Sequence, residues 1–369
     1  MNLPDKNIIQ WIHALTHSTY SFALYRLPWT DECIFILQTN GKAKKLDDIS
    51  GLNGKRGFVI APFRLSNNCP LVVIQPDVLV IGWEEIQKVT FPLEGSTVSS
   101  TATCHLMDSQ STGNLEEYQE TFQQFIHPLK DGTFQKLVLS RTESQTLDEH
   151  FSPLKAFVNA CNSYPRMMIY LCHTPATGTW IGSTPEILLS GHEKEWHTVA
   201  LAGTMPMQGI TIPDTWSEKN KEEQAMVADY IRNIIKKYGG KMEEKGPYTA
   251  RAGQLVHLKT DFHFQLKETR ALGALLKELH PTPAVCGLPK AEAYTFIHRH
   301  EKHERKYYSG FIGWLDPDGQ TDLYVNLRCM EIHPGKAVLY AGGGILPSSE
   351  TASEWDETNE KMKTMKNII

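Results

Sequence analysis

The stretch from Arg328 to Lys361 carries residue types that could hold an anion together with a divalent cation. Gly342-Gly343-Gly344 follows an apolar segment, and residues without a Cβ let the backbone approach a ligand and direct N–H groups at negative charge. Glu354, Glu357 and Lys361 recur at i, i+3 and i+7, which places them on one helix face. Such a face is often simply solvated, but its combination with the glycines and Arg328 favours a site for an anion and a metal ion.

Two residues earlier in the chain could supply a base and an acid. Lys136 opens an apolar strand expected over residues 136–141, although a surface lysine at a strand end is the commoner reason for this pattern. Glu186 follows a Gly-Ser-Thr-Pro bend and directly precedes an apolar strand. Burial there would raise the pKa of its carboxyl and suit it to donate a proton, whereas an arginine partner would make it structural.

Glu223 and three histidines are further candidate metal ligands. Glu223 lies in line with the apolar stripe of a helix expected over residues 217–238, so it needs a partner, and a metal ion is one candidate. His298, His300 and His303 also resemble metal ligands. The arginine, lysine and glutamate residues around these histidines favour a solvated segment instead.

Secondary-structure signals place these candidates on strands and helices. Strands are expected from apolar runs over 136–141, 197–206, 255–260, 323–328 and 338–341, and helices over 115–126 and 217–238. The glycines after the last strand are expected to form a loop, followed by a helix capped near Ser353. The strand over 197–206 is expected to end in a Gly-Thr turn, and a Ser/Thr-rich connection is expected over 94–111.

The composition is that of an ordinary globular protein. With 41% hydrophobic and 21% charged residues, the 369 residues allow one large domain or two ordinary ones. A net charge of -5 gives no electrostatic footprint for nucleic acid. Seven cysteines without paired spacing indicate reduced thiols, and no apolar run approaches the ~18 residues of a membrane span. These observations predict a soluble cytoplasmic protein with neither a nucleic-acid nor a membrane partner.

Ten short blocks, in order, resemble the chorismate-utilising enzymes, and among these the isochorismate synthases most closely. They run from about residue 115 to the C-terminus, and a set in register is far more specific than any single block. The blocks are Lys136-Leu-Val-Leu-Ser-Arg141, Gly182-Ser-Thr-Pro-Glu186, Leu201-Ala-Gly-Thr204, Glu218-Lys-Asn-Lys-Glu-Glu223, His257-Leu-Lys-Thr260, 280–289, Tyr308-Ser-Gly310, Leu327-Arg328, Ala341-Gly-Gly-Gly-Ile345 and Glu354-Trp-Asp-Glu-Thr358.

The resemblance implies a single large α+β unit over residues 1–369, in which two packed antiparallel β-sheets carry helices outside, as in anthranilate synthase component I. Within this unit, residues 1–110 would be a divergent N-terminal part and residues 111–369 the catalytic region that carries the motifs. The family's site lies in the cleft between the sheets. The resemblance also implies a monomer whose partner is a small-molecule substrate, chorismate.

The resemblance assigns roles residue by residue. Lys136 would be the base that activates a water to attack carbon 2 of chorismate, and Glu186 the acid that protonates the hydroxyl leaving carbon 4. Chorismate is a dianion, so cations and N–H donors are what its binding needs. Glu223 and Glu357 would hold the implied cofactor Mg²⁺, with Glu354 nearby. The enolpyruvyl carboxylate would be bound by Arg328, Tyr308, Lys361 and the amides of Gly342 and Gly344. The ring would be lined by His257, Gly203 and Thr204.

Single residues distinguish branches of the family. Lys136 with Ala202 indicates water as the nucleophile, because anthranilate synthases usually lack the lysine and aminodeoxychorismate synthases carry a lysine in place of Ala202. Salicylate synthases share the pair, add pyruvate elimination and tend to carry threonine where this chain has Ala284 at the substrate. A non-catalytic chorismate-binding subunit would not need Lys136 and Glu186 together. The sequence therefore favours an isochorismate synthase, for either menaquinone or siderophore synthesis.

Overall fold

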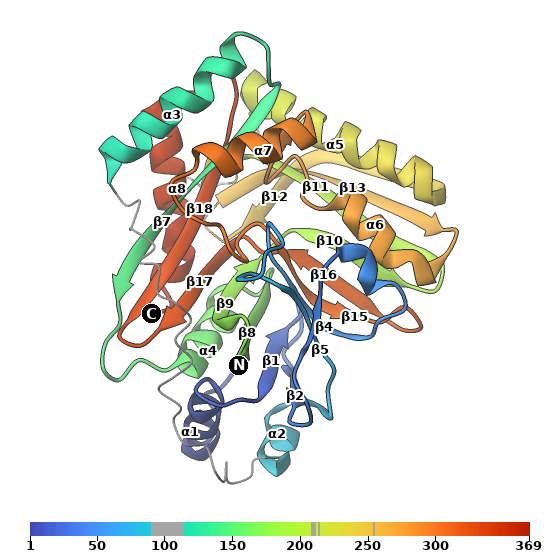
Figure 1. Cartoon of the computed structure of the whole chain (residues 1–369), viewed down its shortest axis with the longest axis vertical. Coiled ribbons are helices and arrows are strands. Elements are labelled where there is room, and N and C mark those ends of the chain that lie inside the picture. The colour runs from blue at the N-terminus through green and yellow to red at the C-terminus, as the bar shows by residue number, and fades with distance from the viewer. Residues whose placement is uncertain (90–113, 208–211, 213–214, 254) are drawn as a thin grey trace.

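The computed structural model describes residues 1–89, 114–207, 212, 215–253 and 255–369. Two antiparallel β-sheets, called sheets A and B, pack face to face with helices on their outer sides (Figure 1), which confirms the predicted α+β class. Each sheet has nine strands among these residues. The expected connection over 94–111 and the boundary expected at residue 110 lie outside the described residues.

Sheet A follows the strand order β14-β7-β18-β17-β9-β8-β1-β2-β6. A long pair of strands near one end of this sheet joins distant parts of the chain, because β7 and β18 run side by side from Leu137 opposite Ile345 to Thr146 opposite Lys336. The strands are β1 (Ser21–Arg26), β2 (Ile34–Gln38), β6 (Val78–Ile81), β7 (Lys136–Thr146), β8 (Met168–Thr174), β9 (Gly178–Thr184), β14 (Gly287–Leu288), β17 (Arg328–His333) and β18 (Lys336–Ile345).

Sheet B follows the order β12-β13-β11-β10-β16-β15-β4-β5-β3. Residues 21–81 therefore supply strands to both sheets. The strands are β3 (Lys44–Leu46), β4 (Gly57–Ala61), β5 (Leu71–Ile74), β10 (Ile187–His192), β11 (Glu195–Pro206), β12 (Gly239–Ala252), β13 (Leu255–Leu266), β15 (Phe311–Leu315) and β16 (Thr321–Val325).

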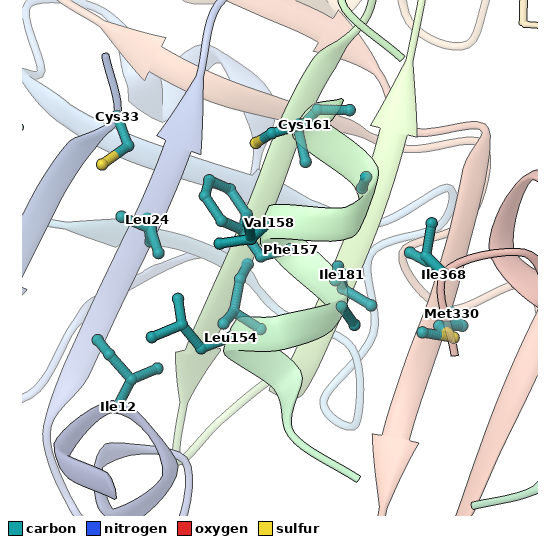
Figure 2. Packing of buried hydrophobic residues seen from close by; sticks show 14 of the residues in the cluster. Ile12, Leu24, Cys33, Leu154, Phe157, Val158, Cys161, Ile181, Met330 and Ile368 are labelled. Carbon is teal, nitrogen blue, oxygen red and sulfur yellow. The ribbon is translucent and has the colours of Figure 1, made fainter. Parts of the chain in front are cut away.

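The helices cover the outer faces of the two sheets. Apolar faces of α5 and α6 pack on sheet B, and those of α1, α4 and α8 pack on sheet A. Figure 2 shows Leu154, Phe157 and Val158 of α4 beside Leu24 and Ile181 of sheet A. The helices are α1 (Lys6–Leu15), α2 (Trp83–Val89), α3 (Leu115–Lys130), α4 (Pro153–Ser163), α5 (Glu218–Tyr238), α6 (Leu272–Leu279), α7 (Lys290–His300) and α8 (Thr351–Lys366), with 3-10 turns η1 (Ile49–Leu52) and η2 (Thr269–Ala271).

Two neighbouring segments cross from one sheet to the other. The chain leaves β9 of sheet A through Pro185 and Glu186 and enters β10 of sheet B. It returns from β16 of sheet B to β17 of sheet A through Asn326 and Leu327. The backbone N–H of Val325 donates to the Glu186 carbonyl over 2.9 Å, so the two crossings are hydrogen-bonded to each other. The continuous strand expected over 323–328 is therefore wrong, because the chain changes sheets in the middle of it.

Three other local expectations are also wrong. The glycines 342–344 belong to β18 and do not form a loop, since β7 pairs with them along one edge. Strand β11 continues through Gly203 as a bulge, where a turn was expected. The last helix begins at Thr351, before Ser353, and no side chain caps it.

Candidate active site

Glu186 lies at the crossing from β9 to β10 with its side chain inside the protein. The residue is 2% exposed, and within the described residues its carboxyl forms no ion pair. Burial raises the pKa of Glu186 to about 8, against the opposing charges of Arg328, Lys136 and Lys361. The expected burial is thus confirmed, and at neutral pH the carboxyl keeps a proton that it can donate.

Lys136 opens β7 and is fully buried, so the alternative of a surface lysine is wrong. Its Nζ lies 2.9 Å from Oε1 of Glu223, which projects from the second turn of α5. Burial opposes ionisation of Glu223, but the adjacent ammonium lowers the pKa of this carboxyl overall. A Cβ at Gly344 would lie 2.1 Å from the same Glu223 oxygen and 3.0 Å from Lys136 Cε. Glycine at 344 therefore makes room for the ion pair.

His257 connects the two sheets at the site. An Arg328 N–H donates to His257 Nε2 over 3.2 Å, so the ring proton resides on Nδ1. Nδ1 then donates to the Gly203 carbonyl at 3.1 Å, with the Thr204 hydroxyl 3.2 Å away. Burial, reinforced by the charges of Arg328 and Lys361, holds the pKa of His257 well below its usual value. The imidazole is therefore neutral and fixes the orientation of Arg328.

The glycines of β18 direct alternate amides away from β7. Ser140, opposite Gly342, uses its N–H on Glu301, and Val138, opposite Gly344, uses its N–H on Cys286, so neither pair exchanges hydrogen bonds. In an antiparallel ladder, the backbone groups of Gly342 and Gly344 must then point to the other edge. Pairing with β17 along that edge stops at Tyr340. The amides predicted to bind a carboxylate thus face this open edge although they belong to a strand.

Further donors line the same edge. Lys361 Nζ donates to the Gly342 carbonyl over 2.7 Å and lies 2.6 Å from Glu357 Oε1. The Tyr308 hydroxyl would touch a Cβ at Gly342 at 2.9 Å, and burial raises the pKa of this phenol to about 12, so it stays a donor. Arg328 is buried and forms no ion pair within the described residues, which leaves its charge for an anion.

The sequence profile described as "Chorismate binding enzyme" matches residues 76–369. This match covers well over half of the chain. The chain belongs to the chorismate-binding enzymes. For a member of this family, donors that gather where two sheets meet are consistent with a small anionic substrate.

The chain is similar to individual members of the family. It is 30% identical over 252 residues to the salicylate biosynthesis isochorismate synthase of Pseudomonas aeruginosa, covering 66% of this chain and 52% of that protein. It is 29% identical over 210 residues to the isochorismate synthase EntC of Escherichia coli, covering 54% of each. The matched region thus spans about half the length of these relatives. The menaquinone-specific isochorismate synthase MenF of Escherichia coli shares the fold, with a TM-score of 0.77, 20% identity and coverage of 100% of this chain and 92% of that one.

The three predicted metal ligands of this chorismate-binding enzyme lie near one another, each beside a lysine. Lys136 pairs with Glu223, Lys361 with Glu357, and Lys219 with Glu354. In the described part of the chain, no three carboxylate, imidazole or thiolate side chains are arranged to hold a metal ion by themselves. Each lysine is therefore the counter-ion of one of these carboxylates.

The chemistry of Glu354 and Glu357 nevertheless fits a divalent cation. A Cβ at Gly343 would lie 3.1 Å from Glu354 Oε2 and 3.3 Å from Glu357 Oε1, so these oxygens share one space. Glu354 Oε2 is buried without a hydrogen-bond partner among the described residues. Burial and the adjacent Glu357 charge raise the pKa of Glu354. An unpartnered carboxylate oxygen beside a second carboxylate is the donor set that Mg²⁺ prefers.

The remaining candidates lie around this group. Ala284 is partly buried in the segment before β14, which pairs with β7 at Lys136. The histidines do not form a metal site, because His298 is exposed while His303 contacts the Ser140 hydroxyl. The solvated segment that was expected instead is wrong for the side chains of Glu301 and Arg305, which are buried and paired. Lys219 was missed, although its spacing four residues before Glu223 places it on the same helix face.

Proposed function

We propose that this protein is an isochorismate synthase that converts chorismate to isochorismate with Mg²⁺ as cofactor. The observation that carries the proposal is the buried Glu186 carboxyl, whose pKa is raised to about 8, within the electrostatic reach of Lys136. Exchange of one hydroxyl group for another on a ring requires one base and one protonated acid, and Lys136 and Glu186 can supply them. The names of the relatives agree with this reaction.

In the proposed reaction Lys136, once neutral, removes a proton from a water molecule whose oxygen bonds to carbon 2 of chorismate. The ring double bonds shift, and the bond from carbon 4 to its hydroxyl breaks. Glu186 delivers its proton to that hydroxyl, which leaves as water. One water is consumed and one released, and a protonated lysine and an ionised glutamate remain to exchange their protons with solvent. The reverse steps use the same two groups, so the reaction is reversible.

The other residues bind and orient the dianionic substrate. Arg328, held by His257, together with Tyr308, Lys361 and the amides of Gly342 and Gly344, would bind the enolpyruvyl carboxylate. Gly203 and Thr204 would line the ring, and Ala284 would lie beside it. Mg²⁺, held by Glu223, Glu354 and Glu357, would supply positive charge for the ring carboxylate.

We further propose that the protein acts as a cytoplasmic monomer. None of the helices among the described residues combines the length and apolar character needed to span a membrane. The similar proteins include isochorismate synthases named for salicylate biosynthesis and for menaquinone.

The test is to incubate the purified protein with chorismate and MgCl₂, with and without ammonium, and to separate the products by chromatography. The proposal predicts isochorismate in equilibrium with chorismate, unaffected by ammonium and lost on chelation of the metal. Salicylate with pyruvate would identify a salicylate synthase, and an aminated product would contradict water as the nucleophile. Chorismate binding without any product would indicate a non-catalytic subunit.

A further inference from the structure

Lys219 is a cation at the site for which the proposed reaction has no role. It is the second residue of α5, and its ammonium pairs with the carboxylate of Glu354 on α8. Helix α5 packs on sheet B and α8 on sheet A, so this ion pair joins the two halves of the site.

The ammonium of Lys219 contacts Glu354, whose other oxygen lies beside Glu357 at Gly343, and Glu223 follows one helical turn later on α5. The lysine thus supplies positive charge to the carboxylates that a divalent cation would use.

The two other lysines at these carboxylates are anchored differently. Lys136 is fully buried, and Lys361 also donates to the Gly342 carbonyl. The Lys219 side chain is 25% exposed and has Glu354 as its hydrogen-bond partner. Lys219 can therefore turn toward solvent with the loss of one contact, which neither of the other lysines can do.

We propose that Lys219 is a built-in counter-ion that competes with the divalent cation for Glu354 and the carboxylates beside it. An ammonium and a metal ion a few ångströms apart repel each other strongly where water is largely excluded. Metal binding at Glu354 therefore requires the Lys219 side chain to leave. While the lysine stays, it neutralises the buried carboxylate and holds α5 against α8. The inference rests on the proposed function for the metal site, and it adds a residue that weakens metal affinity.

The experiment compares Mn²⁺ binding to the full-length protein without chorismate, by calorimetry or by the loss of the free-ion paramagnetic resonance signal. Lys219→Met keeps the length of the side chain and removes its charge, so we expect about tenfold tighter binding, equivalent to about 1.4 kcal/mol. Lys219→Arg should bind Mn²⁺ as the unchanged protein does. The matched control is Lys221→Met on the same turn of α5, which removes an exposed lysine paired with Glu218 and should leave the affinity unchanged.

Thermal unfolding in the presence of chelator adds an independent readout. Lys219→Met should melt at a lower temperature than the unchanged protein in chelator, and saturating Mn²⁺ should remove the difference. If Lys219→Met binds Mn²⁺ equally or more weakly while remaining folded, the competition is overturned and the lysine is structural. If that variant does not fold, Lys219→Gln is measured instead, with the same two criteria.

These results separate the inference from the proposed function. Tighter Mn²⁺ binding by Lys219→Met in a protein that makes no isochorismate would support the counter-ion and contradict the activity. Isochorismate formation together with an unchanged Mn²⁺ affinity in Lys219→Met would support the activity and contradict the counter-ion. Absence of Mn²⁺ binding in both the unchanged protein and Lys219→Met would overturn the metal site together with the role of Lys219.

Discussion

Glu186 and Glu301 are both buried glutamates, yet their surroundings give them opposite charge states. The Glu301 side chain is 3% exposed, and its carboxylate accepts hydrogen bonds from two nitrogens of Arg305 over 2.6 and 2.7 Å. It also accepts hydrogen bonds from the Ser140 amide and hydroxyl. Burial would raise the pKa of Glu301, but Arg305 lowers it overall. Glu186 has no such partner in the described structure, and burial raises its pKa to about 8.

The comparison shows that partners, more than burial, decide what a buried carboxyl does. Arg305 also donates to the carbonyls of Val285 and Val138, so the Glu301 cluster ties the segment after α7 to β7. Such a cluster stabilises structure. A carboxyl without a partner keeps its proton and is available for chemistry.

The largest expected effect follows from removing the proton of Glu186. Glu186→Gln keeps the shape of the side chain but cannot donate a proton, so we expect the turnover of chorismate to fall at least about 10³-fold. The control is Glu301→Gln, which should retain turnover per folded molecule within about tenfold. More than a tenth of normal turnover in Glu186→Gln would show that another group is the acid.

The next effect is a loss of stability, and here the Glu301 variant should be affected more than the Glu186 variant. Glu301→Gln leaves the buried Arg305 guanidinium without its counter-charge, which should cost about 3 kcal/mol of unfolding free energy. Urea unfolding followed by fluorescence measures this loss. A loss below about 1 kcal/mol would mean that water replaces the carboxylate at Arg305.

The pH dependence of stability should distinguish the two glutamates by sign. The pKa of Glu186 rises on folding from 4.5 to about 8, so its contribution is complete below 4.5 and is lost as pH rises through 8. Relative to Glu186→Gln, the unchanged protein should lose roughly 2–4 kcal/mol between pH 5 and pH 8. Glu301, whose pKa is lowered, contributes above its ordinary pKa and loses that contribution as pH falls. A difference between the unchanged protein and Glu186→Gln that does not vary with pH would place the Glu186 carboxyl in water.

The smallest effect comes from one hydrogen bond in the Glu301 cluster. Ser140→Ala removes the hydroxyl that lies 2.9 Å from Glu301 Oε1 and leaves the amide donor in place. We expect a loss of about 1 kcal/mol in urea unfolding and unchanged turnover. A loss of turnover larger than the loss of stability would connect this cluster to the reaction.

The surroundings of Glu186 and the strand position of Lys136 were predicted better than the local structure of other segments. Glu186 was expected to be buried because an apolar strand follows it, and Lys136 was placed correctly at a strand start. The sheet change at Asn326 could not be read from a run of apolar residues, since both sheets accept the same pattern. The glycines were expected to form a loop because glycine is typical of turns, but pairing with β7 outweighed that preference.

Segments rich in charged residues were predicted less well than apolar ones. Strand β12 was missed because most of its residues are polar and exposed, and its hydrogen bonds to β13 supply what its apolar content does not. Glu301 and Arg305 were expected to be solvated because each is charged, yet each satisfies the other inside the protein. The tertiary structure decides which charged residues pair. Neither this cluster nor the Lys219–Glu354 pair could therefore be predicted from composition.

The proposed reaction depends on a Glu186 carboxyl that is protonated at neutral pH. The most direct measurement is the infrared difference spectrum between the unchanged protein and Glu186→Gln, titrated through the carbonyl band of a protonated carboxylic acid. This band should be present at pH 7 and disappear with a midpoint near pH 8, because burial without a partner raises the pKa of Glu186 to about 8. A band already absent at pH 7, with a midpoint near the ordinary value of 4.5, would show that Glu186 is ionised and cannot be the acid.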